Sequence, residues 1–144
     1  MAKALRKRVL HLDDELAAFI LQAAARSHPN ECCGLIEGED AAYGWRAIAL
    51  HEAANLADDP KRHFLIDPQA QFDLLRKLRG GDRRIIGCYH SHPNGSAEPS
   101  ATDAAGAYES GFLYLIAAGA PGEGFTLAAH VFDEAEGFSP VELP

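Results

Sequence analysis

The sequence predicts one α/β domain with a mixed β-sheet and about three helices. Three observations support this class. The chain has 144 residues, the length of one ordinary domain, so residues 1–144 are taken as a single unit. With 47% hydrophobic and 24% charged residues, it can bury a core of its own. Short apolar runs typical of strands alternate with segments of helical periodicity, an order that favours packed layers of strands and helices.

The first half of the chain predicts one helix among several strands. Asp13 is a typical N-cap, and the helix should end before Pro29 because a proline restricts the residue before it. The residues expected on its buried face are Leu16, Phe19, Ile20 and Ala23. The other elements expected here are a strand over residues 5–12, a buried strand over 31–37 with a turn beginning at Gly38, a strand over 42–50, a loop over 51–60 and a short strand over 63–66.

The second half predicts two further helices. Asp67 and Pro68 are a strong helix start as cap and first-turn proline, and the Gly80-Gly81 pair stops that helix. Its inward side chains are expected to be Phe72, Leu75 and Leu78. The remaining expected elements are a buried strand over 84–89, a short helix from about Ser100, strands over 112–118 and 125–132 joined by the turn GAPGEG, and one edge strand near the end.

Composition and charge exclude several classes of function. The net charge is −8 and the pI is about 5.3, whereas a general nucleic-acid binder needs a basic face. No apolar run approaches the roughly 20 residues that span a bilayer, and the N-terminus lacks the apolar region of a signal peptide. The three cysteines are expected to be reduced thiols. We therefore expect a cytoplasmic protein that binds neither nucleic acid nor membrane.

Residues 90–103, HSHPNGSAEPSATD, contain the strongest chemical signal. Alternate residues of a strand point to the same side, so His90 and His92 at a strand end place two imidazoles next to each other. Such a pair can bind a tetrahedral metal, with Zn–N distances of about 2.0–2.1 Å. The same pattern also fits two exposed histidines at a strand end.

Asp103 is a candidate third ligand, and Ser100 precedes it by three residues. Ser100 and Asp103 also fit a capping box at the start of a helix, and the two interpretations are compatible. Three protein ligands with one open position are typical of a catalytic zinc site.

A hydrolytic site of this kind also needs a general base. Spacing alone leaves several acidic candidates, namely Glu31, Glu37, Glu52, Asp67, Glu98 and Glu109. Glu31 is favoured because it begins an otherwise apolar strand, where a carboxylate is either paired or functional.

The motif resembles the JAMM motif of MPN-domain metalloproteases, which has the form His-Ser/Thr-His, seven residues, Ser, two residues, Asp. The stretch HPNECCGLIEG, which contains Glu31, resembles the upstream Pro-x-Glu-x-Cys-Gly segment of the same family. The segment HFLIDPQAQFDLLRKLR looks like the bacterial and archaeal stand-alone branch. The resemblance spans residues 10–131, nearly the whole chain.

The resemblance implies a role for each matching residue. His90, His92 and Asp103 would bind one Zn²⁺ per chain, leaving the fourth position to water. Glu31 would accept the proton of that water and pass it to the leaving amine. Ser100 would donate a hydrogen bond to the oxyanion. The family fold is a curved mixed β-sheet flanked by helices and is similar to that of the cytidine deaminases.

The implied activity is hydrolysis of an amide or isopeptide bond after the C-terminal Gly-Gly tail of a ubiquitin-like or sulfur-carrier protein, which would be the partner. Two alternatives stay open: a non-catalytic MPN scaffold, and a JAMM hydrolase acting on a small-molecule amide. A zinc deaminase is disfavoured because the chain has no Pro-Cys-x-x-Cys motif. A homodimer is also left open.

Overall fold

The computed structural model describes residues 8–107 and 109–144. In chain order the elements are β1 (Val9–His11), α1 (Asp14–Ser27), β2 (Cys33–Ala41), β3 (Gly44–Ala53), α2 (Pro68–Leu78), β4 (Arg84–His92), α3 (Ala101–Gly106), β5 (Leu113–Ala120), β6 (Gly124–Asp133) and β7 (Gly137–Val141). This succession of strands and three helices confirms the predicted mixed α+β class.

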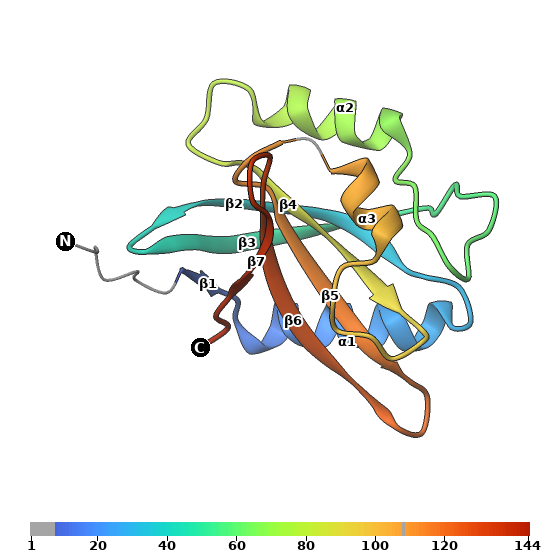
Figure 1. Ribbon diagram of the computed structural model, residues 1–144. Helices are drawn as coiled ribbons and strands as arrows, with labels where there is room; N and C mark the ends of the chain where they lie inside the picture. Colours follow the sequence, from blue (N-terminus) through green and yellow to red (C-terminus); the bar gives the residue numbers. More distant parts are fainter. Residues whose placement is uncertain (1–7, 108) are drawn as a thin grey trace.

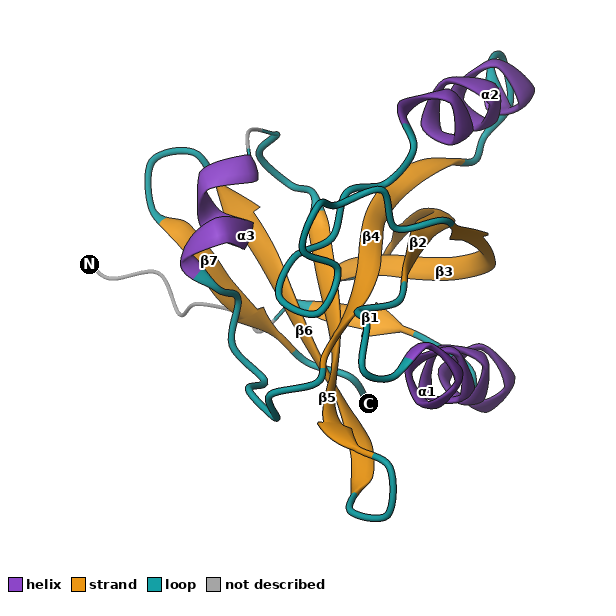
Figure 2. Cartoon of the chain, turned by 90° about the vertical axis from the view of Figure 1, so that its right-hand side faces the viewer, coloured by secondary structure: helices purple, strands orange, loops and turns teal. Residues whose placement is uncertain are grey.

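The seven strands form one curled sheet in the order β1-β3-β2-β4-β5-β6-β7. The β1/β3 and β4/β5 pairs are parallel, and the other neighbouring strands are antiparallel. A bridge between Val9 and Glu142 brings the two ends of the sheet together, and the Leu10 N–H donates to the Glu142 carbonyl over 3.0 Å. The curling of the sheet is visible in Figure 2.

Helices α1 and α2 lie on opposite sides of the sheet (Figure 1). Ile20 and Ala23 of α1 are fully buried in the larger core, which also contains Tyr89 of β4. A smaller core on the other side includes Leu74 of α2 and Cys88 of β4. Because side chains alternate along β4, the residues that follow Cys88 at every second position face the α2 side.

The predicted helix starts are confirmed by their caps. The Asp13 carboxylate accepts a hydrogen bond from the Leu16 N–H (2.9 Å), and the Asp67 carboxylate accepts one from the Gln69 N–H (3.0 Å). Ser100 and Asp103 form the expected capping box. Side chains that satisfy the free N–H groups of a first turn thus fix where each helix begins.

The predicted turn at Gly38 is wrong, because β2 continues to Ala41 with a bulge after Glu37. A Cβ atom at Gly38 would collide with the Arg46 carbonyl and the Ile86 side chain, so this glycine permits close packing and does not mark a turn. The predicted loop over 51–60 is wrong at its start, because β3 stays paired with β2 as far as Ala53.

Three other expectations need correction. Residues 63–66 form no strand, and Ile66 makes only an isolated bridge to Asn55. On α2, Phe72 and Leu75 are exposed (53% and 52%), while Leu74 is buried, because the helix contacts the sheet along a different face. Phe19 of α1 is likewise on the exposed side, at 36%. Within the predicted strand over 5–12 the structure has β1, and residues 5–7 lie outside the described part of the chain.

Among the residues that the structure describes, no helix combines the length and the apolar character needed to cross a membrane.

Candidate functional site

The end of β4 presents His90 and His92 side by side on the face that carries α2. His90 is paired with Cys33 of β2 on one side and with Ile116 of β5 on the other, so this strand end is held between two neighbours. Both histidines are buried, at 0% and 4% exposure, and their Nε2 atoms are 2.9 Å apart. The alternative of two exposed histidines at a strand end is therefore excluded.

Asp103 reaches the same point from the first turn of α3. Its Oδ2 atom lies 3.2 Å from His90 Nε2 and 3.1 Å from His92 Nε2. The same oxygen accepts a hydrogen bond from the Ser100 N–H at 2.7 Å, so the capping box orients the carboxylate toward the histidines. Cap and candidate ligand are thus two roles of one side chain.

These three atoms fit a tetrahedral metal. Ligands about 2.0–2.1 Å from such a metal lie about 3.3–3.4 Å from one another. The three separations here, 2.9, 3.2 and 3.1 Å, are close to that spacing. Glu31 forms a wider group with the two histidines, whose candidate ligand atoms all lie within 4.8 Å of one another. The site can therefore hold a metal ion, with either carboxylate available to complete the ligand set.

The environment of His92 sets its tautomer. Its Nδ1 atom lies 2.8 Å from the Ser96 carbonyl, which can only accept a hydrogen bond, so Nδ1 carries the proton. Neutral His92 therefore presents a lone pair on Nε2 toward His90 and Asp103, as a metal ligand must. Burial lowers the pKa of His92, but hydrogen bonds to Asp103 and to the Ser96 carbonyl outweigh it and raise the pKa above its usual value.

The His90 ring is held by aromatic stacking, whereas that of His92 is held by a hydrogen bond. The Phe64 ring stacks on it, with ring centroids 4.2 Å apart and planes 20° from parallel. Burial lowers its pKa, which keeps the ring neutral. Asp103 has its pKa held well below the usual range, because hydrogen bonds from His90 and His92 outweigh the effect of burial. The site thus combines neutral imidazole with an ionised carboxylate, the donor set that zinc and similar divalent metals prefer.

Glu31 lies just before β2 and is 4% exposed. Its Oε1 atom is buried and has no hydrogen-bond partner among the described residues. Burial raises the pKa of this carboxyl to about 7, against a smaller opposing effect of His92. A carboxyl group that can gain or lose its proton near neutral pH suits a general base.

Ser100 joins this group through α3. Its Oγ atom accepts the Asp103 N–H at 3.0 Å. Because that bond uses a lone pair, the hydroxyl hydrogen remains available to donate. The structure therefore brings all five sequence-predicted site residues into one region, whereas Glu37 lies elsewhere and pairs with His51 and Arg83.

The structure also shows supporting residues that sequence reasoning missed. The Ser91 hydroxyl, between the two histidines, accepts the Cys32 N–H at 2.7 Å and so ties β4 to the backbone beside Glu31. Asn55 donates to the Glu31 carbonyl at 3.1 Å from a segment predicted only as loop. For Ser91 the alternation of the strand is a usable signal, because its side chain must point away from the histidines. A single asparagine in a loop carries no such signal.

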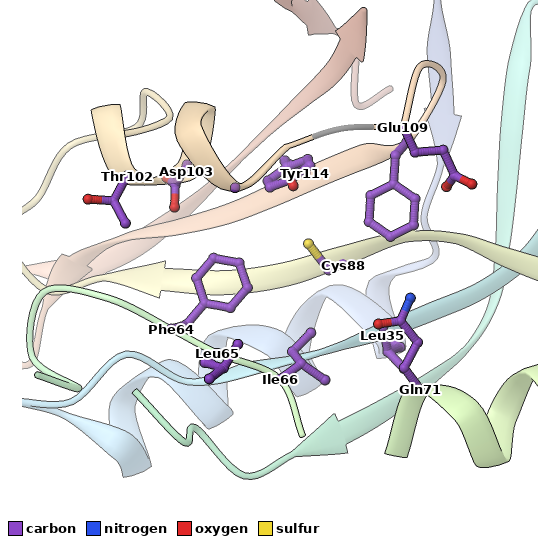
Figure 3. A pocket seen from close by; sticks show the side chains of 12 residues that line it. Leu35, Phe64, Leu65, Ile66, Gln71, Cys88, Thr102, Asp103, Glu109 and Tyr114 are labelled. Carbon is purple, nitrogen blue, oxygen red and sulfur yellow. The ribbon is translucent and has the colours of Figure 1, made fainter. Parts of the chain in front are cut away.

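A cleft of about 230 Å³ begins at Asp103 and runs between α3 and the segment before α2. Figure 3 shows Thr102 and Asp103 on one wall, Phe64 and Ile66 on the opposite wall, and Cys88 between them. Most of the lining is apolar, and Gln71 and Glu109 add polar groups. Of the five predicted site residues, the cleft is lined by Asp103.

The three cysteines are free and buried. Cys32, the most exposed of the three together with Cys88, is only 4% exposed. Burial raises the pKa of Cys32, raises that of Cys33 to about 12, and raises that of Cys88 further. The thiols therefore stay protonated at neutral pH, which disfavours a role as nucleophile.

The raised pKa of Glu31 predicts a pH-dependent cost of stability in the metal-free protein. The unfolded chain ionises this group near pH 4.5, while the folded chain keeps the proton up to about pH 7. The folded state thus binds more protons in this window, and the free energy of unfolding falls as the pH rises through it. Relative to the wild type, Glu31→Gln should gain about 3 kcal/mol between pH 4.5 and pH 8. Urea unfolding of both proteins, in the presence of a chelator at pH 4.5 and at pH 8, measures this difference in the free energy of unfolding. If the difference between variant and wild type is the same at both pH values, the raised pKa of the buried Glu31 carboxyl is wrong.

Comparison with known proteins gives a consistent result. The family model described as prokaryotic homologs of the JAB domain matches residues 13–129. The chain is 32% identical over 103 residues to a desampylase of Haloferax volcanii, covering 72% of this chain and 73% of that protein. It is 28% identical over 108 residues to the CysO-cysteine peptidase of Mycobacterium bovis, covering 75% and 72%. A probable metalloprotease of Haloferax volcanii is 30% identical over 115 residues, covering 76% and 66%.

Solved structures share the fold. A solution structure of a protein from Desulfitobacterium hafniense has a TM-score of 0.80 and 26% identity, covering 94% of this chain and 92% of that one. A crystal structure of a JAB1/MPN domain protein from Archaeoglobus fulgidus has a TM-score of 0.54 and 19% identity, covering 94% and 97%. Fold and site define a hydrolase of the JAMM type with a site for a metal. The chain belongs to the family of prokaryotic homologs of the JAB domain.

Proposed function

We propose that the protein is a zinc-dependent peptidase or isopeptidase that cleaves the amide bond after the C-terminal Gly-Gly tail of a ubiquitin-like or sulfur-carrier protein. The observation that carries the proposal is the buried Glu31 carboxyl, whose Oε1 has no hydrogen-bond partner among the described residues, beside two histidines that share the Asp103 carboxylate. That arrangement provides a general base next to a metal site.

His90, His92 and Asp103 would hold the metal. Asp103 is preferred over Glu31 as third ligand because its oxygen already lies at ligand spacing from both imidazoles. Bound there, a zinc ion would supply Lewis-acid activation of water and of the scissile carbonyl. Neutral imidazoles and a carboxylate support zinc.

Glu31 would take the proton from the attacking water and deliver it to the leaving amine. Both transfers are favoured by a pKa near the working pH, and burial places the pKa of this carboxyl at about 7. A bound cation would lower that pKa, because a nearby positive charge favours the ionised form. Glu31 is then ionised at neutral pH and ready to act as the base.

Ser100 would donate its hydroxyl hydrogen to the oxygen on which negative charge develops. Its Oγ atom is fixed by the Asp103 N–H, so the donor is in place before the reaction. Ser100→Ala should lower kcat by about 10²–10³-fold with little change in KM, because the hydrogen bond strengthens only in the transition state. Steady-state kinetics on the metal-loaded enzyme test this, and an unchanged kcat would remove Ser100 from the mechanism.

The substrate assignment rests on the cleft and on two relatives. An extended tail can follow the cleft to Asp103, and glycines at its end allow the backbone to approach closely because they carry no side chain. The relatives named desampylase and CysO-cysteine peptidase support a carrier-type protein as the acyl side of the substrate. Cytoplasmic location and action on a protein conjugate are parts of the same proposal.

A cleavage assay tests the assignment. One Gly-Gly-tailed carrier protein is joined to a free amino acid, another to a lysine peptide, and a small aryl amide serves as a third substrate. We expect release of the carrier from at least one conjugate and little turnover of the aryl amide. Turnover of the aryl amide alone would favour the small-amide alternative. If the metal-loaded protein turns over none of the three substrates, the alternative of a non-catalytic MPN scaffold is favoured.

A further inference from the structure

Asn55, just after β3, uses the full hydrogen-bonding capacity of its side chain. Its Nδ2 donates to the Glu31 carbonyl at 3.1 Å and to the His63 carbonyl at 2.9 Å. Its Oδ1 accepts the N–H groups of Ala57 and Leu65, each at 3.0 Å. An amide has two donor hydrogens and two acceptor lone pairs, so this side chain is satisfied by four backbone groups.

The backbone of Glu31 depends on this network. Its carbonyl accepts from Asn55, and its N–H donates to the Pro60 carbonyl at 2.7 Å. Both main-chain polar groups of Glu31 are thus held by residues 55–60. Since Glu31 precedes the first residue of β2, the sheet itself does not fix this residue. Its position relative to His90 and His92 is therefore set by this segment, together with the Cys32–Ser91 contact.

The same amide also holds the wall of the cleft. The His63 carbonyl and the Leu65 N–H, which Asn55 binds, lie on either side of Phe64 in the chain. The Phe64 ring stacks on His90, and Phe64 and Leu65 line the cleft. One side chain therefore joins the backbone of Glu31 to the segment that packs against His90.

We propose that Asn55 is a positioning residue that sets the distance of the Glu31 carboxylate from the metal-binding histidines. The inference rests on the proposed role of Glu31 as general base. Chemistry explains why an amide is needed, because this position must donate to two carbonyls and accept from two N–H groups. An aspartate has the same shape but would place a carboxylate against the carbonyl oxygens of Glu31 and His63, so it loses both donor contacts.

Asn55→Asp tests the proposal in the metal-loaded, full-length protein. We expect kcat to fall by about 10–100-fold, because small misplacement of a reacting group is costly. Metal content after gel filtration should stay at the wild-type value, and KM should change less than kcat. Should Asn55→Asp not fold, Asn55→Ser, which keeps one hydroxyl donor, is measured in the same way with a smaller expected loss.

Val141→Ala is the matched control for stability alone. Val141 is buried in β7, in the core on the α1 side, and its truncation should lower Tm without moving Glu31. Both variants are assayed well below their Tm. If Val141→Ala loses as much kcat as Asn55→Asp, or if Asn55→Asp keeps wild-type kcat, the positioning role is wrong.

Glu31→Gln distinguishes failure of the positioning role of Asn55 from failure of the proposed function. An inactive Glu31→Gln with a fully active Asn55→Asp overturns only the positioning role. An active Glu31→Gln overturns the base itself.

Discussion

Glu31→Gln should abolish amide hydrolysis while leaving the metal bound. The expected loss in kcat is at least about 10²–10⁴-fold, the usual contribution of a positioned general base. Gln keeps the size of the side chain but accepts no proton at neutral pH. Since His90, His92 and Asp103 remain, metal content measured by elemental analysis should stay at one ion per chain.

Glu37→Gln is the matched control, because it makes the same change at the other buried glutamate of the described chain, away from the site. Glu37 lies in β2 with its carboxylate paired to His51 and Arg83, and it has no contact with the metal-binding histidines in the described structure. We expect it to keep kcat and to lose only stability. Hydrolysis by Glu31→Gln at the wild-type rate would show that another group takes the proton.

Asp103→Asn should remove both the metal and the activity. The substitution replaces the anionic oxygen that lies 3.1–3.2 Å from the two imidazoles with a neutral group. Changes in residues that merely support ligands cost 10–100-fold in metal affinity, so loss of a ligand should cost about 100-fold or more. Competition with a chromogenic chelator measures the affinity.

Ser100→Ala is the matched control for Asp103→Asn, because it removes the Oγ acceptor of the same capping box and keeps the Asp103 carboxylate. Loss of the Ser100 cap costs about 0.5–2 kcal/mol of stability in Ser100→Ala. Only Asp103→Asn should also lose metal affinity. Equal metal affinity in the two variants would show that Asp103 acts solely as a cap and that Glu31 completes the ligand set.

Much of the site could be predicted, because several of its residues also belong to local sequence patterns that mark a strand or the start of a helix. His90 and His92 lie at the end of the apolar strand β4, and alternation alone places them on one face. Ser100 and Asp103 form a capping box that is visible in the sequence, and the same box aims the carboxylate. The proximity of Glu31 to His90 and His92 depends on the pairing of β2 with β4. The spacing of the residues does not show this pairing, so only the family resemblance predicts that Glu31 belongs to the site.

The errors have physical causes of a different kind. The composition around Gly38 predicts a turn, but Gly38 is a strand glycine required by close packing against Arg46. Phe72 and Leu75 have helical spacing, yet α2 contacts the sheet through Leu74, since tertiary packing chooses the buried face. The segment 63–66 resembles a strand by composition, but the Asn55 side chain takes the place of a partner strand. Long-range contacts of this kind leave no local pattern.

The most direct test of the account is hydrolysis of a Gly-Gly-tailed carrier conjugate by one preparation in three states: as purified, after removal of metal by a chelator, and after return of one equivalent of Zn²⁺. We predict that cleavage is lost in the second state and restored in the third, with His90→Ala inactive in all three. Cleavage that continues at the same rate in metal-free protein would contradict the metal site at the centre of the proposal.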